Sequence, residues 1–238
     1  MGHAVLIVAI LRWPASSRGV LRDWYPLLLM PLFYAEIPLL NQCWSSGYRD
    51  ARILALESAV CGGQPSRTLA AALPFTPLSE LLHLCYLSYY PLIFVPPLLL
   101  YVQGRRAEFG HTVLAVMVTF YVCYVCFIYY PVEGPRYLWP VPTAVPRGMI
   151  QALAQRILEL GSSRGAAFPS AHVAVAVTQS LLALRQQVKL APLLILLTMG
   201  MGVGAVYGGF HYCVDVLAGA LIASLAIAIT HRLPQSAQ

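Results

Sequence analysis

Charged side chains are scarce in this chain. Only 10% of its 238 residues are Asp, Glu, Lys or Arg, whereas 59% are hydrophobic, and the mean hydropathy is +0.69. A soluble domain carries about 25% charged residues, so the composition excludes that class. The only lysine is Lys189, and the arginines are scattered along the chain rather than gathered in one segment. This scatter argues against a nucleic-acid-binding protein despite the formal charge of +6.

Motifs for a bound metal ion are missing from the sequence. No Cys-x-x-Cys pair meets a second pair or nearby histidines, and no cluster of acidic residues offers the oxygen ligands of a hard cation. We therefore expect a site without metal or other cofactor. Cys43 and Cys61 flank one hydrophilic segment and would form a disulfide if that segment faces an oxidising compartment. The sequence leaves that pairing open.

Long apolar runs, by contrast, occupy most of the chain. A chain of this length has room for six spans of about 20 residues each. Six runs are present, at residues 24–40, 81–102, 112–130, 170–184, 190–206 and 212–230. The predicted fold class is an all-α integral membrane protein, a bundle of six transmembrane helices.

Basic residues in the short loops predict the orientation of the bundle. With six spans, the clusters before the first run, between runs two and three and between runs four and five fall on one side. The positive-inside rule makes that side cytoplasmic, together with both termini, although the totals of eight and seven basic residues do not separate the two sides. The starts of runs four and six then lie on the non-cytoplasmic side, which is periplasmic or luminal.

Ionisable side chains mark the starts of these two runs. His211 and Asp215 lie four residues apart, which in a helix places them on one face, close enough for the carboxylate to hold the imidazole. His172 opens the fourth run in the same way, at the end of the segment Phe-Pro-Ser-Ala-His. Ionisable groups at the mouth of a transmembrane helix indicate a functional site. We predict an interfacial active site at this level.

These residue types suit phosphoryl transfer. An imidazole nitrogen can attack phosphorus when the other nitrogen is fixed by a hydrogen bond, and a second histidine can protonate the departing oxygen. The phosphate also needs donors, which backbone N–H groups at a helix N-terminus provide, here at Ser170 and Ala171. The candidates for guanidinium ligands of the phosphate are Arg136, Arg147 and Arg164.

Residues 168–172 and 206–219 resemble the second and third signature motifs of the type-2 phosphatidic acid phosphatase superfamily, which comprises membrane lipid phosphatases and related phosphotransferases of six helices. The resemblance implies that His211 is the nucleophile forming a phosphohistidine, that Asp215 orients it and that His172 is the general acid and base. It also implies a lipid phosphate as substrate, the bilayer as its surroundings and, for a transferase, a polyol acceptor.

The expected organisation is one membrane domain over residues 1–238. Its parts are an N-terminal interfacial segment (1–23), helices one to three (24–130), an active-site loop (131–167) and helices four to six (168–231).

The arginines depart from the usual pattern of this family. The first motif is not present in its usual form, and the segment ending in Arg136 occupies its place. The third motif normally has an arginine six residues before its histidine, where this chain has Ala205. The inositol phosphorylceramide and sphingomyelin synthases resemble the family with similarly relaxed arginine motifs. Three functions therefore stay open: a lipid phosphatase, an inositol-phosphoryl-type phosphotransferase with an alcohol acceptor, and a non-catalytic lipid-phosphate binder or transporter.

Overall fold

The computed structural model describes residues 8, 12, 19–139 and 148–232, and this part of the chain is helical. The helices are α2 (Gly19–Trp44), α3 (Asp50–Cys61), α4 (Pro65–Ala72), α5 (Thr76–Leu87), α6 (Tyr89–Val102), α7 (Arg106–Tyr129), α8 (Pro135–Leu138), α9 (Met149–Gly161), α10 (Ala171–Arg185), α11 (Ala191–Tyr207) and α12 (Cys213–His231). Among the described residues, the sole β-type pairing is an isolated parallel bridge between Val132 and Ala166.

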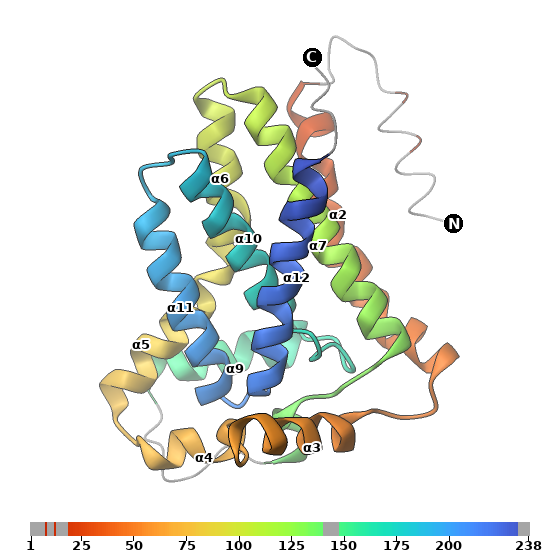
Figure 1. Ribbon diagram of the computed structural model, residues 1–238, viewed down its shortest axis with the longest axis vertical. Helices are drawn as coiled ribbons and strands as arrows, with labels where there is room; N and C mark the ends of the chain where they lie inside the picture. Colours follow the sequence, from red (N-terminus) through yellow and green to blue (C-terminus); the bar gives the residue numbers. More distant parts are fainter. Residues whose placement is uncertain (1–7, 9–11, 13–18, 140–147, 233–238) are drawn as a thin grey trace.

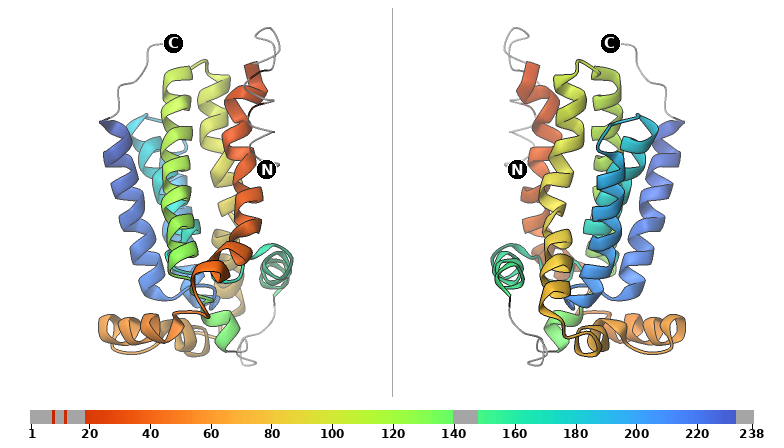
Figure 2. Two further views of the ribbon diagram at one scale, coloured as in Figure 1. Left: turned by 90° about the vertical axis from the view of Figure 1, so that its right-hand side faces the viewer. Right: turned by 90° about the vertical axis from the view of Figure 1, so that its left-hand side faces the viewer.

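Six helices stand side by side and the others lie across one end of them. Helices α2, α6, α7, α10, α11 and α12 run along the long axis of the molecule (Figure 1). Helices α3, α4 and α9 lie across the end at which α10 and α12 begin, and this arrangement is clear from two sides in Figure 2. The starts of α10 and α12, with their histidines, therefore lie at the end of the bundle where these three helices are found.

The apolar helices differ in length. Within the described residues, α7, with 24 residues, and α12, with 19, are long and apolar enough to cross a membrane. The pair α5 and α6 makes a third candidate if it counts as one bent span, while α10 and α11 are shorter apolar helices. The described part of the chain is thus all-helical, with two or three candidate membrane spans.

The predicted span at residues 81–102 is broken. Helices α5 and α6 meet at an angle of 46° around Ser88. The Ser88 hydroxyl donates to the carbonyl of Cys85 at 2.5 Å, and Pro91 has no N–H to donate to the carbonyl of Leu87. Both features weaken the helical hydrogen-bond ladder at the same turn, which is a common cause of a kink.

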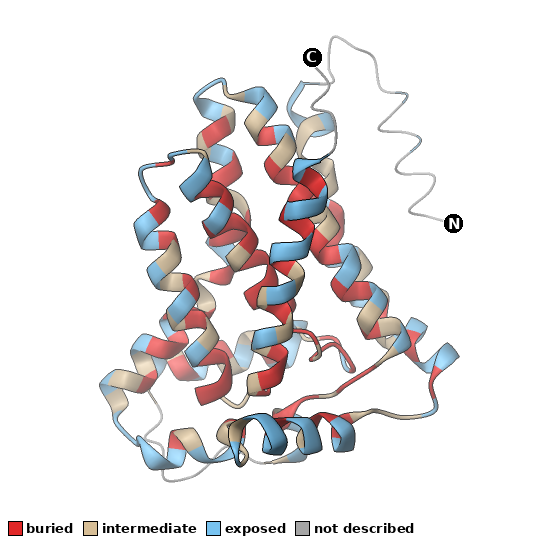
Figure 3. Cartoon of the chain, in the orientation of Figure 1, coloured by how far each residue is buried: buried red, intermediate tan, exposed pale blue. Residues whose placement is uncertain are grey.

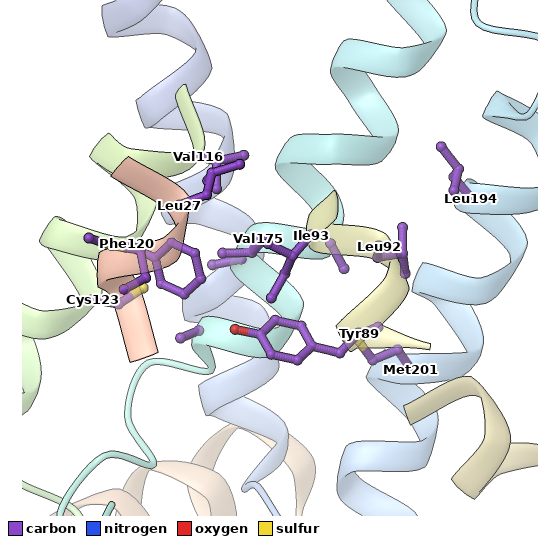
Figure 4. Packing of buried hydrophobic residues seen from close by; sticks show 14 of the residues in the cluster. Leu27, Tyr89, Leu92, Ile93, Val116, Phe120, Cys123, Val175, Leu194 and Met201 are labelled. Atoms are coloured by element: carbon purple, nitrogen blue, oxygen red, sulfur yellow. The ribbon is translucent and has the colours of Figure 1, made fainter. Parts of the chain in front are cut away.

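The core fills the space between the upright helices. Leu27 of α2, Val116 of α7, Val175 of α10 and Met201 of α11 are buried there, and Figure 4 shows these side chains among the helices, with Leu27 beside Val116 and Met201 beside Tyr89. The outward faces are apolar as well. Leu217, Leu221 and Leu225, spaced by one turn on α12, are each more than half exposed. A helix that is apolar all round is typical of a membrane protein, and burial is accordingly patchy along these helices (Figure 3).

The hydrophilic segment between the first two apolar runs is helical rather than extended loop. Helix α3 ends at Gly62, whose left-handed conformation (φ 69°) lets its N–H donate to Ser58, and α4 begins with Pro65, which suits the first turn of a helix. The sequence analysis did not anticipate α3 and α4, because neither has the length or hydropathy of a span.

Candidate active site

The N-terminus of α12 holds His211 in one tautomer. The Asp215 carboxylate accepts the backbone N–H of Tyr212 at 2.8 Å and so caps the helix. The Nδ1 atom of His211 lies 2.9 Å from the Ala167 carbonyl oxygen and 3.4 Å from Asp215 Oδ2. Two acceptors beside Nδ1 favour the proton on that nitrogen, which leaves the Nε2 lone pair available to attack an electrophile.

The N-terminus of α10 brings the second histidine to the same place. The Ser170 hydroxyl accepts the N–H of Val173 as the helix cap, and the Ser170 N–H donates to the carbonyl of Asp215 at 3.0 Å. The starts of α10 and α12 are thereby joined. As a result the rings of His172 and His211 lie 5.7 Å apart, centre to centre.

Two tyrosines hold the His172 ring from the side of the α5–α6 break. Tyr86 stacks on the imidazole with its hydroxyl 3.4 Å from Nε2, and the ring of Tyr89 lies 4.1 Å from the imidazole centre. Both tyrosines are buried. Tyr86 and Tyr89 are thus part of the surroundings of His172.

Residues 131–136 lie beside the segment that precedes α10. The N–H of Val132 donates to Gly165, and the N–H of Ala167 donates back to Val132 at 2.9 Å. Since the Ala167 carbonyl also accepts from His211, this pairing fixes the segment that ends in Arg136 relative to the histidine.

Arg136 has an unsatisfied donor in this region. Its Nη2 reaches the carbonyl of Leu158 at 3.5 Å, whereas its buried Nη1 has no hydrogen-bond partner. A buried guanidinium nitrogen without a partner is costly, and an anion bound there would satisfy it.

A small cavity connects these groups. It measures about 30 Å³ and is lined by thirteen side chains, among them His172, His211, Arg136, Tyr86 and Glu133. About 10–15 Å³ of such space is enough for one water molecule, so the cavity can hold water. Two imidazoles and a guanidinium therefore line one small cavity.

Of the remaining predicted ligands, Ser170, Ala171 and Arg164 do not line this cavity. Ser170 is fully buried and its N–H is used by Asp215, while Ala171 is buried beside it. Arg164 forms an ion pair with Glu133, and its side chain is 58% exposed. Arg147 lies outside the described residues. Ala205 is fully buried, and its carbonyl accepts the N–H groups of Phe210 and His211, at 2.9 and 3.1 Å.

Sequence reasoning missed two carboxylates on α3. Asp50 accepts the Tyr212 hydroxyl at 2.9 Å, and Glu57 accepts the Cys213 N–H at 2.8 Å. Both partners adjoin His211. The sequence signal for their role was weak. The two acidic residues are seven positions apart in the hydrophilic segment, and no pattern links them to α12.

The structure also bears on the cysteines. Cys43, Cys61 and Cys213 are all free thiols. The thiol of Cys61 lies beside that of Cys213, and the exposed thiol of Cys43 donates to the carbonyl of Leu39. The neighbour of Cys61 in the fold is therefore Cys213.

Comparison with known proteins agrees with the geometry. No curated protein and no solved structure matched the chain. A family model described as the PAP2 superfamily matches residues 51–229, a stretch that begins one residue after Asp50 and includes the rest of α3, Arg136, both histidines and Asp215. This match confirms the resemblance noted in the two helix-mouth motifs, and the chain belongs to the PAP2 superfamily, the type-2 phosphatidic acid phosphatases and their relatives.

Proposed function

We propose that this protein is a membrane-embedded lipid phosphatase or phosphotransferase that cleaves a lipid phosphoester through a phosphohistidine, without a metal ion. One observation supports the proposal above the others: His211, His172 and Arg136, whose guanidinium has an unpartnered buried nitrogen, line one cavity. Nucleophile, proton donor and anion ligand are the parts that phosphoryl transfer requires.

In the first step, the Nε2 lone pair of His211 attacks phosphorus. A P–N bond forms while the bond from phosphorus to the lipid oxygen breaks, and His172 donates a proton to that departing oxygen. Asp215 and the Ala167 carbonyl, both at Nδ1, stabilise the positive charge that develops on the imidazole. In the second step, His172 removes a proton from water or an alcohol, which attacks phosphorus and breaks the P–N bond.

Arg136 is the proposed ligand of the phosphoryl oxygens. The position at which the family's third motif usually has an arginine is Ala205, which is fully buried and does not line the cavity. The role of phosphate ligand is therefore assigned to Arg136, in the segment between α7 and α9. Arg164 assists indirectly, since its ion pair neutralises Glu133, a carboxylate in the cavity wall that would otherwise repel phosphate.

The proposed setting is a bundle of six membrane-crossing units: α2, the bent pair α5 and α6, α7, α10, α11 and α12. With both termini in the cytoplasm, the cavity lies at the opposite, non-cytoplasmic interface. A lipid substrate would then reach His211 with its chains still in the bilayer.

The test uses purified protein in detergent with a panel of lipid phosphates and diphosphates. Free phosphate and new lipid products are followed with and without inositol or other polyols. His211→Ala should lose turnover, whereas His231→Ala, at the far end of α12, should keep it. Phosphate release indicates a phosphatase, and an acceptor-dependent lipid product indicates a transferase. Equal turnover in His211→Ala and the wild type would refute the proposed mechanism.

A wild type that binds lipid phosphate without turnover would instead indicate the non-catalytic binder or transporter. In that case His211→Ala keeps most of the affinity.

A further inference from the structure

Helix α3 presents two buried carboxylates to the site. Asp50 and Glu57 are 6% and 0% exposed, respectively, and their spacing of seven residues places them on one face of the helix, two turns apart. Burying a carboxylate is costly unless its oxygens are well hydrogen-bonded. The donors that satisfy these two carboxylates indicate what α3 does.

Asp50 joins the two segments that supply the nucleophile and the phosphate ligand. Its Oδ1 accepts the Tyr212 hydroxyl and the N–H of Gly134, and its Oδ2 accepts the N–H of Glu133, each at 2.9 Å. Tyr212 follows His211, and Gly134 lies two residues before Arg136. One carboxylate therefore sets how far the nucleophile lies from the guanidinium.

The geometry around Asp50 is closely specified. Gly134 has φ 95°, and a Cβ atom there would lie 3.0 Å from Ala167 Cβ and 3.3 Å from the Phe210 carbonyl. A side chain at this position would be strained by the backbone and crowded by the residues next to His211. Burial, followed by the charge of Asp50, raises the pKa of Tyr212, so that its hydroxyl stays protonated and donates.

Glu57 contacts only the nucleophile side. It accepts the N–H of Cys213, in the first turn of α12, at 2.8 Å and the Ser66 hydroxyl of α4 at 3.0 Å. It thus fixes the direction of the turn that positions His211, and among the described residues it makes no hydrogen bond with the segment of Arg136.

We infer that Asp50 and Glu57 are positioning residues of this site: Asp50 sets the separation of His211 and Arg136, and Glu57 sets the orientation of His211. This inference rests on the proposed function. It predicts that the two carboxylates affect different kinetic constants, which a role confined to holding α3 on the bundle would not produce.

The experiment compares kcat and KM of four variants in detergent. Asp50→Asn places an amide N–H₂ against the Glu133 N–H, so we expect KM for lipid phosphate to rise and kcat to fall. Glu57→Leu removes the acceptor of the Cys213 N–H, so we expect kcat to fall with KM unchanged. The losses in kcat/KM should be about ten- to hundredfold, as for a misplacement of about 1 Å.

In Glu57→Gln, the amide oxygen still accepts from Cys213 and the hydroxyl of Ser66 can turn to accept, so activity should be retained. Glu159→Gln, an exposed carboxylate changed to the same amide, is the control.

Wild-type kcat and KM in folded Asp50→Asn, or equal losses in Glu57→Leu and Glu57→Gln, would overturn the inference. If Asp50→Asn fails to fold, Tyr212→Phe removes a single one of its hydrogen bonds and should still change kcat/KM. A wild type without turnover counts against the proposed function, but the positioning role of α3 can then still be tested by a measurement that needs no turnover. The rate at which diethyl pyrocarbonate modifies His211, followed by mass spectrometry, should then differ between wild type and Glu57→Leu, and an equal rate would refute the positioning role.

Discussion

Gly219→Ala should damage the active site through the packing of α10 on α12, without altering any group that takes part in the chemistry. A Cβ atom at Gly219 would lie 2.5 Å from the carbonyl oxygen of Ser170 and 3.2 Å from the N–H nitrogen of Ala174. An ordinary contact begins at 3.4 Å, so the helices would have to separate by 3.4 − 2.5, or about 0.9 Å. The contact falls at the cap of α10, two residues from His172.

The expected magnitudes follow from that displacement. Overpacking of this kind costs about 1–3 kcal/mol, whereas replacing glycine by alanine inside a helix stabilises it by about 0.5–1 kcal/mol. The net destabilisation should therefore be only about 0–2.5 kcal/mol, and the protein should fold. Activity should suffer more, because moving His172 relative to His211 by about 1 Å costs up to about a hundredfold in rate.

The assay is lipid-phosphate turnover together with thermal unfolding in the same detergent. Gly202→Ala in α11 is the matched control, because its Cβ would meet Val216 Cγ1 at an ordinary 3.4 Å. The control should be as stable as the wild type or slightly more so, with unchanged turnover. If Gly219→Ala is as active as Gly202→Ala, the close approach of α10 and α12 does not set the distance between the histidines, and the reasoning fails.

Two further substitutions test the surroundings of the histidines. Ala205→Arg restores the usual residue of the third motif, but Ala205 is fully buried, so a guanidinium there could not reach water. We expect a destabilisation of several kcal/mol, seen as a lower unfolding temperature, and no gain in phosphate release. A more active, equally stable variant would contradict this expectation. Tyr86→Phe removes the hydroxyl 3.4 Å from His172 Nε2 and should lower kcat by about tenfold or less, the equivalent of one hydrogen bond of about 0.5–1.5 kcal/mol. An unchanged pH profile and rate would show that Tyr86 does not assist His172.

The helix mouths could be predicted from the sequence because the relevant contacts are local. His211 and Asp215 are four residues apart, and their approach depends on a single turn of α12. Likewise, the N-cap at Ser170 can be predicted from the residues that follow it. The family assignment depended on the same short segments, and the PAP2 superfamily match confirms it.

The contacts that the sequence did not reveal are distant along the chain. Asp50 and Tyr212 are 162 positions apart, and neither lies in a pattern that indicates the other. The break at Ser88 was hidden because hydropathy continues across it while the hydrogen-bond ladder does not. Tyr86 lies in no motif, and aromatic residues near the ends of apolar runs are typical of the membrane surface. In the fold, however, it packs on His172.

The shortness of α10 and α11 has a consequence for the lipid around them. These helices have 15 and 17 residues, so at about 1.5 Å per residue they are roughly 22 and 26 Å long. The hydrocarbon core of a typical bilayer is about 30 Å thick. In the proposed bundle, the membrane beside α10 and α11 would therefore have to thin, or the polar mouth of the site would lie below the level of the surrounding headgroups. Thinning would bring the phosphate of a neighbouring lipid to the level of His211, whereas without thinning that phosphate would have to leave the headgroup layer and move inward to reach His211.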